Sequence, residues 1–487
     1  ISLCGLLTAC DLQEEPYGFY SDDNFYKSET DAESGLLYAY NALTFLEYSR
    51  GIFYIGDIPT ETMSPKSDEA GDVYQLENWI ANRETEQLQY YFKYCYIAIN
   101  RANTVIDHIQ NSSVLSETAR RRILGEAYFL RAWNYFNLVR TFGIVPVQTK
   151  MVAELSQTTP PMATGLDQLY DLILGDLTRA DNLLEVNKVF GRADKVAAQS
   201  LMAKAYLTIA SSKEHNVHRY TEMRREPRIM YDSAAYWAGK VVRDYKNVYD
   251  FDTNLRDIYD VDKPTGPEHI FIMPIDRSGT QEGNYSKLPL LFLPSNNSVP
   301  FYIRYGNGDL QRANGNGWGV FLCNDEFVET QFSTTDKRRT ELIHRDIYDA
   351  SGNPIVPNQV KGYFSSKYVD PDFIGERTSA RPYLIRFSDI ALVYAEAAGP
   401  QAGLAYVNRI RERAGVTPLP SGMTTDKFRE AVIKERALEL AFEGNRLYDL
   451  RRTASVTTTD IKAAGLSEAE AAYYPIPQRE IDLNPNL

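Results

Sequence analysis

The chain has 487 residues, of which 44% are apolar and 24% charged, and this is the composition of a folded protein rather than a disordered one. Its length exceeds what one simple core supports, so we expect a large domain with an insertion, or two closely packed parts. The net charge of −13 and the lack of a basic patch argue against a nucleic-acid partner, because phosphate binding needs clustered Lys and Arg.

The chain begins ISLCGLLTAC, an apolar run that ends in small residues and a cysteine. A run this short cannot span a bilayer, which takes roughly 20 apolar residues. Residues 1–9 are predicted to be the remnant of a lipoprotein signal peptide, and Leu7-Thr8-Ala9-Cys10 has the pattern of a bacterial lipobox. The thiol of Cys10 would carry the lipid that anchors the protein to a membrane. The alternative is an ordinary signal peptide that contains a cysteine.

Apolar periodicity predicts helices through the first half of the chain. They span Asp31 to Leu46, Thr85 to Ile109, Glu117 to Phe142, Leu166 to Leu184, Ala193 to Ala210 and Ser233 to Tyr245. Alanines at close-packing spacings in GEAYFLRAWNYFNL and AAQSLMAKAYL let paired helices stack as a solenoid. The stretch LGEAY, residues 124–128, matches the L-G-x-x-Y core of a tetratricopeptide repeat. The predicted fold class is mainly α, with a tetratricopeptide-like helical-repeat frame.

From about Tyr249 to Tyr383 the sequence is rich in Gly, Pro, Asn, Asp and aromatic residues. We expect turn-rich loops with a few short strands, one of them around Ile270 to Pro274. Helices resume at Ile385 to Ala398, Gly403 to Ala414 and Thr425 to Glu443. The domain prediction is therefore an N-terminal helical region (10–248), a loop-rich, partly β excursion (249–384) and a C-terminal helical region (385–487) that completes the same domain. Long irregular segments of this kind often carry function.

Carboxylates and arginines alternate in one block near the C-terminus. Its members are Glu435, Arg436, Glu439, Glu443, Arg446, Asp449, Arg451 and Arg452. Glu435 and Glu439 share a helix face, as a paired acid and base would. However, interleaved arginines keep carboxylates ionised, whereas a general acid needs a raised pKa, so we interpret the block as a structural ion-pair network. No HExxH, GxSxG, P-loop or CxxC motif occurs, and we predict no enzyme, no metal and no cofactor.

Aromatic and polar side chains occur together in two irregular regions, the loop after the first helix and the excursion. A sugar ring stacks its C–H face on an aromatic ring, while carboxylate, amide and guanidinium groups bond its hydroxyls. The candidate ligand-binding residues are Asp68, Tyr74 and Trp79 in the early loop, and Tyr285, Tyr302, Arg304, Tyr305 and Trp318 in the excursion. Each aromatic residue could equally be a packing residue. The glycines around Trp318 are predicted to let its loop bend tightly.

The C-terminal third closely resembles the SusD/RagB family of surface glycan-binding lipoproteins in YLIRFSDIALVYAEAA, AYVNRIRERAGV, IKERALELAFEGNRLYDLRR and YYPIPQREIDLNPNL. In the first half, GEAYFLRAWNYFNLVRTFGIVPV and GRADKVAAQSLMAKAYLTIA are similar to the helical repeats of that family. The resemblance implies a tetratricopeptide-like frame with a variable, ligand-binding excursion. It also implies lipid anchoring on the extracellular face of the outer membrane and a SusC-like TonB-dependent transporter as partner.

The function that the resemblance implies is capture of an oligosaccharide or polysaccharide and its delivery to the transporter for import, rather than catalysis. A peptide-capturing importer lid, as in the RagB branch, is the first alternative. A surface glycosidase is the second, because a sequence this rich in Asp and Glu does not exclude a pair of catalytic carboxylates.

Overall fold

The computed structural model describes residues 25–69, 71–277, 286–355 and 360–487. Its longer helices are α1 (Glu29–Asn41), α2 (Leu46–Gly56), α4 (Glu86–Ile109), α5 (Glu117–Phe142), α6 (Leu166–Leu183), α7 (Lys195–Glu214), α8 (Pro227–Asp244), α12 (Phe387–Ala398), α13 (Pro400–Arg413) and α14 (Thr425–Glu439). The shorter ones are α3 (Asp72–Glu77), α9 (Leu288–Phe292), α10 (Asp325–Gln331), α11 (Lys337–Leu342), α15 (Arg446–Arg452), α16 (Val456–Thr459), α17 (Glu468–Ala472) and α18 (Gln478–Leu483).

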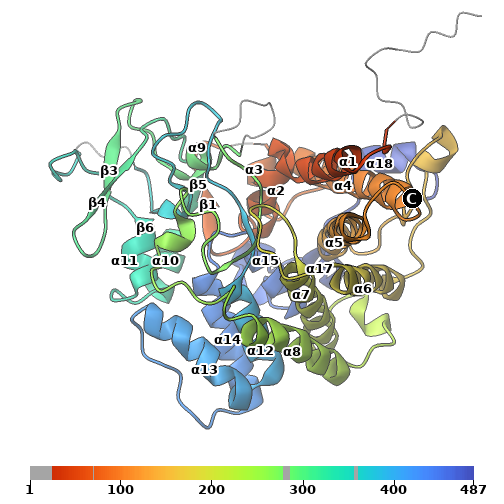
Figure 1. Ribbon diagram of the computed structural model, residues 1–487. Helices are drawn as coiled ribbons and strands as arrows, with labels where there is room; N and C mark the ends of the chain where they lie inside the picture. Colours follow the sequence, from red (N-terminus) through yellow and green to blue (C-terminus); the bar gives the residue numbers. More distant parts are fainter. Residues whose placement is uncertain (1–24, 70, 278–285, 356–359) are drawn as a thin grey trace, which may run out of the picture.

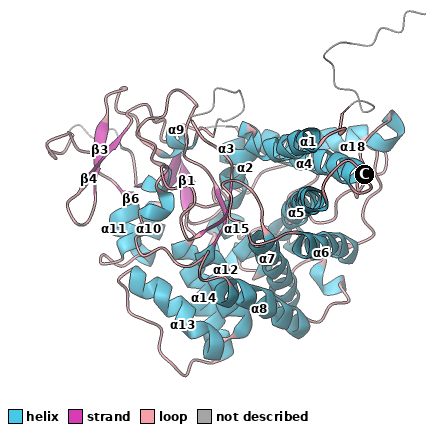
Figure 2. Cartoon of the chain, viewed as in Figure 1, coloured by secondary structure: helices cyan, strands magenta, loops and turns pink. Residues whose placement is uncertain are grey.

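Short strands occur in pairs and lie mostly to one side of the helices (Figure 2). They are β1 (Met63–Pro65), β2 (His269–Ile272), β3 (Phe301–Arg304), β4 (Leu310–Ala313), β5 (Phe321–Cys323), β6 (Ile343–His344), β7 (Phe364–Ser365) and β8 (Tyr383–Arg386). The antiparallel pairs are β1–β5, β2–β8, β3–β4 and β6–β7. The mainly α prediction, with a partly β excursion, is confirmed.

Helices α4 to α8 pack in chain order, each against the next, as stacked helical repeats do (Figure 1). The helix predicted over Glu117 to Phe142 coincides with α5, and those for α4 and α6 differ by one residue at one end. Gly125 of the LGEAY stretch explains one close approach, since a Cβ there would lie 2.7 Å from Leu184 Cγ at the end of α6. The tetratricopeptide-like frame is thus confirmed.

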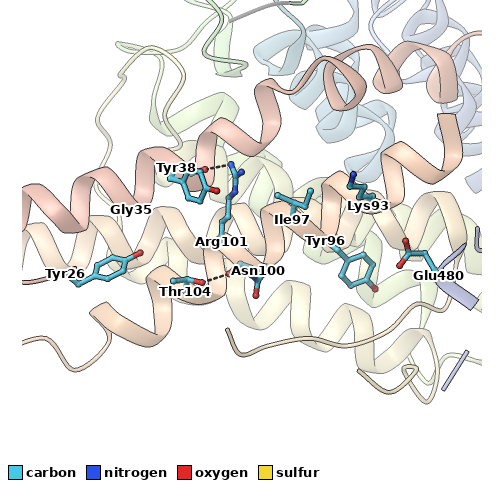
Figure 3. A pocket seen from close by; sticks show the side chains of 10 residues that line it. All are labelled: Tyr26, Gly35, Tyr38, Lys93, Tyr96, Ile97, Asn100, Arg101, Thr104 and Glu480. Carbon is cyan, nitrogen blue, oxygen red and sulfur yellow. Dashed lines mark hydrogen bonds between the residues drawn. The ribbon is translucent and has the colours of Figure 1, made fainter. Parts of the chain in front are cut away.

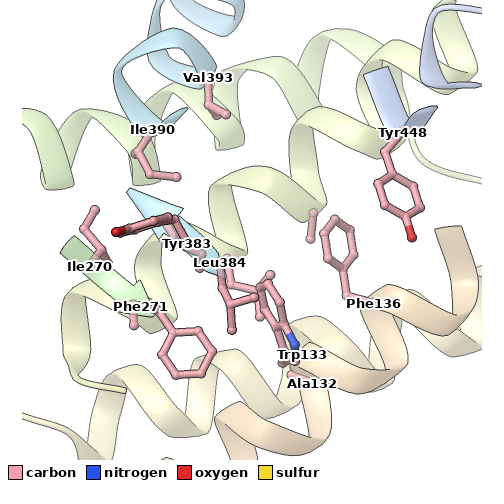
Figure 4. Close-up of a cluster of buried hydrophobic side chains, with 14 of the residues drawn as sticks. Ala132, Trp133, Phe136, Ile270, Phe271, Tyr383, Leu384, Ile390, Val393 and Tyr448 are labelled. Atoms are coloured by element: carbon pink, nitrogen blue, oxygen red, sulfur yellow. The ribbon is translucent and has the colours of Figure 1, made fainter. Parts of the chain in front are cut away.

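The main core joins the frame to the base of the excursion. Trp133 of α5 is buried, and its ring lies 5.6 Å from that of Phe271 on β2, edge to face. Figure 4 shows these rings packed beside Leu384 of β8 and Ile390 of α12. Because β2 pairs with β8, the two ends of the excursion are held side by side against α5.

The acidic and basic block folds into a buried ion-pair network, as the sequence analysis predicts. Arg386, at the end of β8, pairs with Glu268 and Glu439 at 2.8 Å each and with Glu443 at 2.8 Å. Arg338 of α11 pairs with Glu435 at 2.6 Å. These side chains are almost fully buried. The network therefore ties β8 and α11 to α14.

A second buried group continues the network toward α7 and α12. Arg436 pairs with Asp389 at 2.8 Å and with Asp449 at 2.9 Å, and Lys204 also bonds Asp389. Arg452 bonds Glu396 of α12. Every charge in this group faces an opposite charge, which is the condition under which buried ions are tolerated.

We expect acid to destabilise the fold through these carboxylates. Burial raises the pKa of Glu439, but Arg413, Arg386 and Arg338 outweigh it and lower that pKa from 4.5 to about 2. Because the folded-state pKa is depressed, the stabilisation is present above about pH 4.5 and is lost as the pH falls toward 2. The melting temperature should fall by about 5 °C or more between pH 6 and pH 3.

Calorimetry across this range checks the prediction, with Glu439→Gln as the matched variant. That variant should be less stable at pH 6 and should lose less further stability on acidification. An unchanged melting temperature from pH 6 to pH 3 in the parent chain would contradict the role given to the buried carboxylates.

The C-terminal segment after α17 runs across the frame as a strap, residues 473–487. The N–H of Tyr474 donates to Thr141 O at 2.9 Å, and that of Gln478 donates to Arg83 O at 3.0 Å. Arg451 also donates to Thr141 O, at 3.2 Å, so it satisfies a carbonyl at the end of α5. Of the helices in the described ranges, none is long and apolar enough to cross a membrane.

Candidate functional site

Trp318 lies in the loop between β4 and β5, with 47% of its surface exposed. The backbone N–H of Trp318 donates to Leu290 O at 2.6 Å, and the backbone N–H of Gly319 donates to Leu293 O at 2.9 Å. A Cβ on Gly317 would lie 2.0 Å from Leu293 O. Only glycine therefore lets the loop approach the backbone after α9 so closely. The predicted tight glycine loop around Trp318 is confirmed, and it fixes the backbone of an exposed indole.

The early loop lies beside the Trp318 loop because β1, which belongs to the early loop, pairs with β5, which follows Trp318. Pro65 pairs with Phe321, and the N–H of Lys66 donates to Val320 O at 2.9 Å, two residues from Trp318. Helix α3 packs against β1 and carries Tyr74, which is 52% exposed. Figure 1 shows α3, β1, β5 and α9 grouped together. We call this surface the Trp318 face and define it by Asp68, Tyr74, Lys287, Trp318 and Glu376.

The charges of the Trp318 face are paired. Lys287 Nζ lies 5.6 Å from the centre of the Trp318 ring and 2.6 Å from Glu376. Asp68 is exposed and pairs with Lys66 at 3.1 Å, and this ammonium lowers the pKa of Asp68. The ammonium of Lys287 and the carboxylate of Glu376 thus lie beside the exposed Trp318 ring, and the exposed Tyr74 ring lies on helix α3, which packs on the strand paired with β5. Such a surface can stack a ring and bond its hydroxyl groups.

Two of the predicted ligand aromatics are packing residues in the structure. Trp79 is 8% exposed, donates to Asp460 at 3.2 Å and lies stacked 6.3 Å from the ring of Tyr474 in the strap. Tyr305 is 6% exposed, and the guanidinium carbon of Arg256 lies 4.4 Å from the centre of its ring. Neither ring has a free face for a ligand, so neither belongs to the Trp318 face.

The remaining predicted residues belong to the β3–β4 hairpin or lie outside the described residues. Tyr302 is half-buried and pairs with Arg312. Arg304 is exposed, lies 4.3 Å from the centre of the Tyr348 ring and donates to Gly352 O. Tyr285 and Cys10 lie outside the described residues. The hairpin leads directly into the Trp318 loop, and the backbone N–H of Asn296, in the segment between α9 and β3, donates to Gly315 O of that loop at 2.9 Å.

Sequence reasoning missed Lys287 and Glu376 of the Trp318 face. They are far apart in the chain, and neither stands in a recognisable motif, so no local pattern marks them. The histidines of the excursion are elsewhere: His269 and His344 are buried, and burial lowers the pKa of each to about 4. Within the described ranges, no group of three His, Cys, Asp or Glu residues is arranged to hold a metal ion.

The fold and the site define a helical-repeat protein whose loop-rich excursion carries an exposed aromatic surface. Two family models match the chain, one described as SusD family over residues 341–471 and one described as starch-binding associating with outer membrane over residues 26–207. The chain belongs to the SusD-like family.

Curated relatives match over nearly the whole chain. SusD-like protein P2 of Formosa agariphila is 24% identical, with 93% of this chain and 89% of the relative covered. A SusD-like protein of Bacteroides ovatus is 25% identical, with 91% of this chain and 80% of the relative covered.

Solved structures share the fold. A SusD homolog from Bacteroides thetaiotaomicron superposes with a TM-score of 0.77 at 20% identity, covering 95% of this chain and 97% of the other. A protein described as a laminarin-binding SusD-like protein has a TM-score of 0.74 at 23% identity, with 94% and 98% covered.

Proposed function

We propose that this protein binds an oligosaccharide or polysaccharide at the Trp318 face. The observation that carries the proposal is an indole that is 47% exposed on a backbone fixed by glycines and hydrogen bonds. A pre-formed aromatic surface costs little to order on binding, which suits a shallow sugar site. Two structural relatives support it: the laminarin-binding SusD-like protein, and surface glycan-binding protein A from Bacteroides thetaiotaomicron, which is in complex with laminarihexaose.

We further propose that lipid on Cys10 anchors the protein to the extracellular face of the outer membrane. The family description, starch-binding associating with outer membrane, supports this location. There the protein would deliver its glycan to a SusC-like TonB-dependent transporter, without cleaving it. Residues 249–384 are the ligand-binding excursion in this proposal, and the flanking helical regions form the frame. Attachment beside the transporter would raise the effective concentration of ligand and compensate for modest affinity.

A binding screen of the purified chain tests the proposal. The array would hold plant, host and microbial glycans, with a peptide library alongside, and a reducing-end assay would follow each hit. Binding of a glycan class without release of reducing ends supports the proposal. Binding of peptides alone would favour the peptide-capturing alternative, and release of reducing ends would favour a glycosidase.

A further inference from the structure

A surface cavity of about 590 Å³ lies among helices of the frame, away from the Trp318 face (Figures 1 and 3). Helix α4 supplies one wall, and α1 and α18 flank it. We call it the α4 groove and define it by Tyr38, Lys93, Tyr96, Asn100, Arg101 and Glu480. Its volume is within the range of small-ligand sites, about 300–1,000 Å³.

Helical spacing builds the groove. Lys93, Tyr96, Asn100 and Arg101 are three or four residues apart, or adjacent, and so share one side of α4. Tyr38 of α1 is 58% exposed, so its ring is open to solvent at the groove. The groove therefore combines tyrosine rings with amide, ammonium and guanidinium groups, all carried by helices.

The charges of the groove differ from those of the Trp318 face. The Arg101 guanidinium lies 3.6 Å from the centre of the Tyr38 ring, and its Nη1 donates to Tyr38 O at 2.9 Å and to Asn41 Oδ1 at 3.3 Å. Within the described part of the chain, neither Arg101 nor Lys93 forms an ion pair, although the Lys93 ammonium lies close enough to Glu480 to lower the pKa of that carboxyl in part. Two cations without ion-pair partners in one groove stand out in a chain of net charge −13.

The stacking on Tyr38 fixes the plane of the guanidinium before a ligand arrives. Only Nη1 is used by the hydrogen bonds to Tyr38 and Asn41, so Nε and Nη2 keep the fork that matches a carboxylate. Glu480, at the α18 side, makes no ion pair among the described residues, and burial raises its pKa.

We propose that the α4 groove is a second ligand site, for an acidic oligosaccharide whose sugars carry carboxylates. A sugar carboxylate binds Arg101, the Lys93 ammonium attracts the next acidic group, and Tyr38 and Tyr96 contact the rings. Asn100 supplies a side-chain amide for hydroxyl groups. The site is independent of the Trp318 face, so one long glycan could engage both and gain avidity.

Calorimetric titration of the purified chain with an oligogalacturonate hexamer tests this inference, with laminarihexaose as the neutral comparison. Arg101→Gln and Lys93→Gln should each weaken oligogalacturonate binding about tenfold or more, and added salt should weaken it in the parent chain. Arg409→Gln, on the exposed surface of α13, is the matched control and should leave binding unchanged. Trp318→Ala should also leave it unchanged, which separates this test from that of the proposed function.

Three outcomes would overturn the inference. The first is no oligogalacturonate binding by the parent chain, and the second is equal binding by the parent and Arg101→Gln. The third is loss of oligogalacturonate binding in Trp318→Ala alone, which would place the acidic glycan on the Trp318 face. If Arg101→Gln instead abolished binding to a purified SusC-like transporter, with no oligogalacturonate bound, the groove would be a protein-docking surface.

Discussion

Arg386→Met is expected to lower the free energy of unfolding by about 3–5 kcal/mol. The substitution keeps much of the side-chain volume but removes the charge that Glu268, Glu439 and Glu443 share. Those carboxylates are buried, and although Arg413 still pairs with Glu268 and Glu439 and Lys367 still pairs with Glu443, the network is left one positive charge short. Breaking a buried ion pair is costly because the partner stays uncompensated, whatever the pair contributed when intact. Urea unfolding followed by circular dichroism measures the change.

Arg409→Met is the matched control for this experiment. Arg409 pairs with Asp250 at 3.1 Å, but its side chain is 45% exposed, and surface pairs contribute about 0–1 kcal/mol. A loss at Arg386 no larger than that at Arg409 would show that the buried network is not what holds the excursion to the frame.

Trp318→Ala is expected to weaken glycan binding at least tenfold, or by roughly 1.4 kcal/mol, with little change in stability. The indole is half exposed, so its removal leaves no cavity in the core, while the glycines and backbone hydrogen bonds of the loop remain. What is lost is the flat apolar surface on which a sugar ring stacks. Titration with a glycan identified in the binding screen, together with a melting curve, measures both quantities.

Trp237→Ala serves as the comparison for Trp318→Ala. Trp237 lies on α8 and is half-buried, where its ring contacts Tyr236 at 5.1 Å, edge to face. This substitution should leave glycan affinity unchanged and lower stability. Unchanged affinity in Trp318→Ala would remove the Trp318 face as the glycan site while leaving the family membership intact.

Much of the helical frame could be predicted from sequence because its cause is local. Helix α5 has clear local signals at both ends, since the Ser116 side chain accepts from the Ala119 N–H at the start and Gly143 follows the end. Helix α2 was not predicted. Its sequence, LEYSRGIFYIG, contains two glycines and several aromatic or β-branched residues, which are weak helix formers.

The aromatic site could be predicted only in part because burial of a ring depends on distant segments. Trp79 and Trp318 look alike in sequence, since both lie among Gly, Asn and Asp residues. Trp79 is covered because Asp460 and Tyr474, almost four hundred residues later, pack on it. The β1–β5 pair that joins the early loop to Trp318 likewise connects distant segments of chain. No local pattern encodes either contact.

The β2–β8 pair has a consequence for how this chain could diverge. It holds the two ends of the excursion together. The stability of the frame therefore depends on these two strands rather than on the length of chain between them. The entropy of closing a loop rises only slowly with length, by about 0.6 kcal/mol for each doubling. Evolution can therefore lengthen, shorten or rewrite the tip without unfolding the repeats. The excursion residues that enter the buried network, such as Glu268 and Arg338, and those that pack in the main core, such as Phe321, are constrained, and ligand preference can drift in the exposed loops around them.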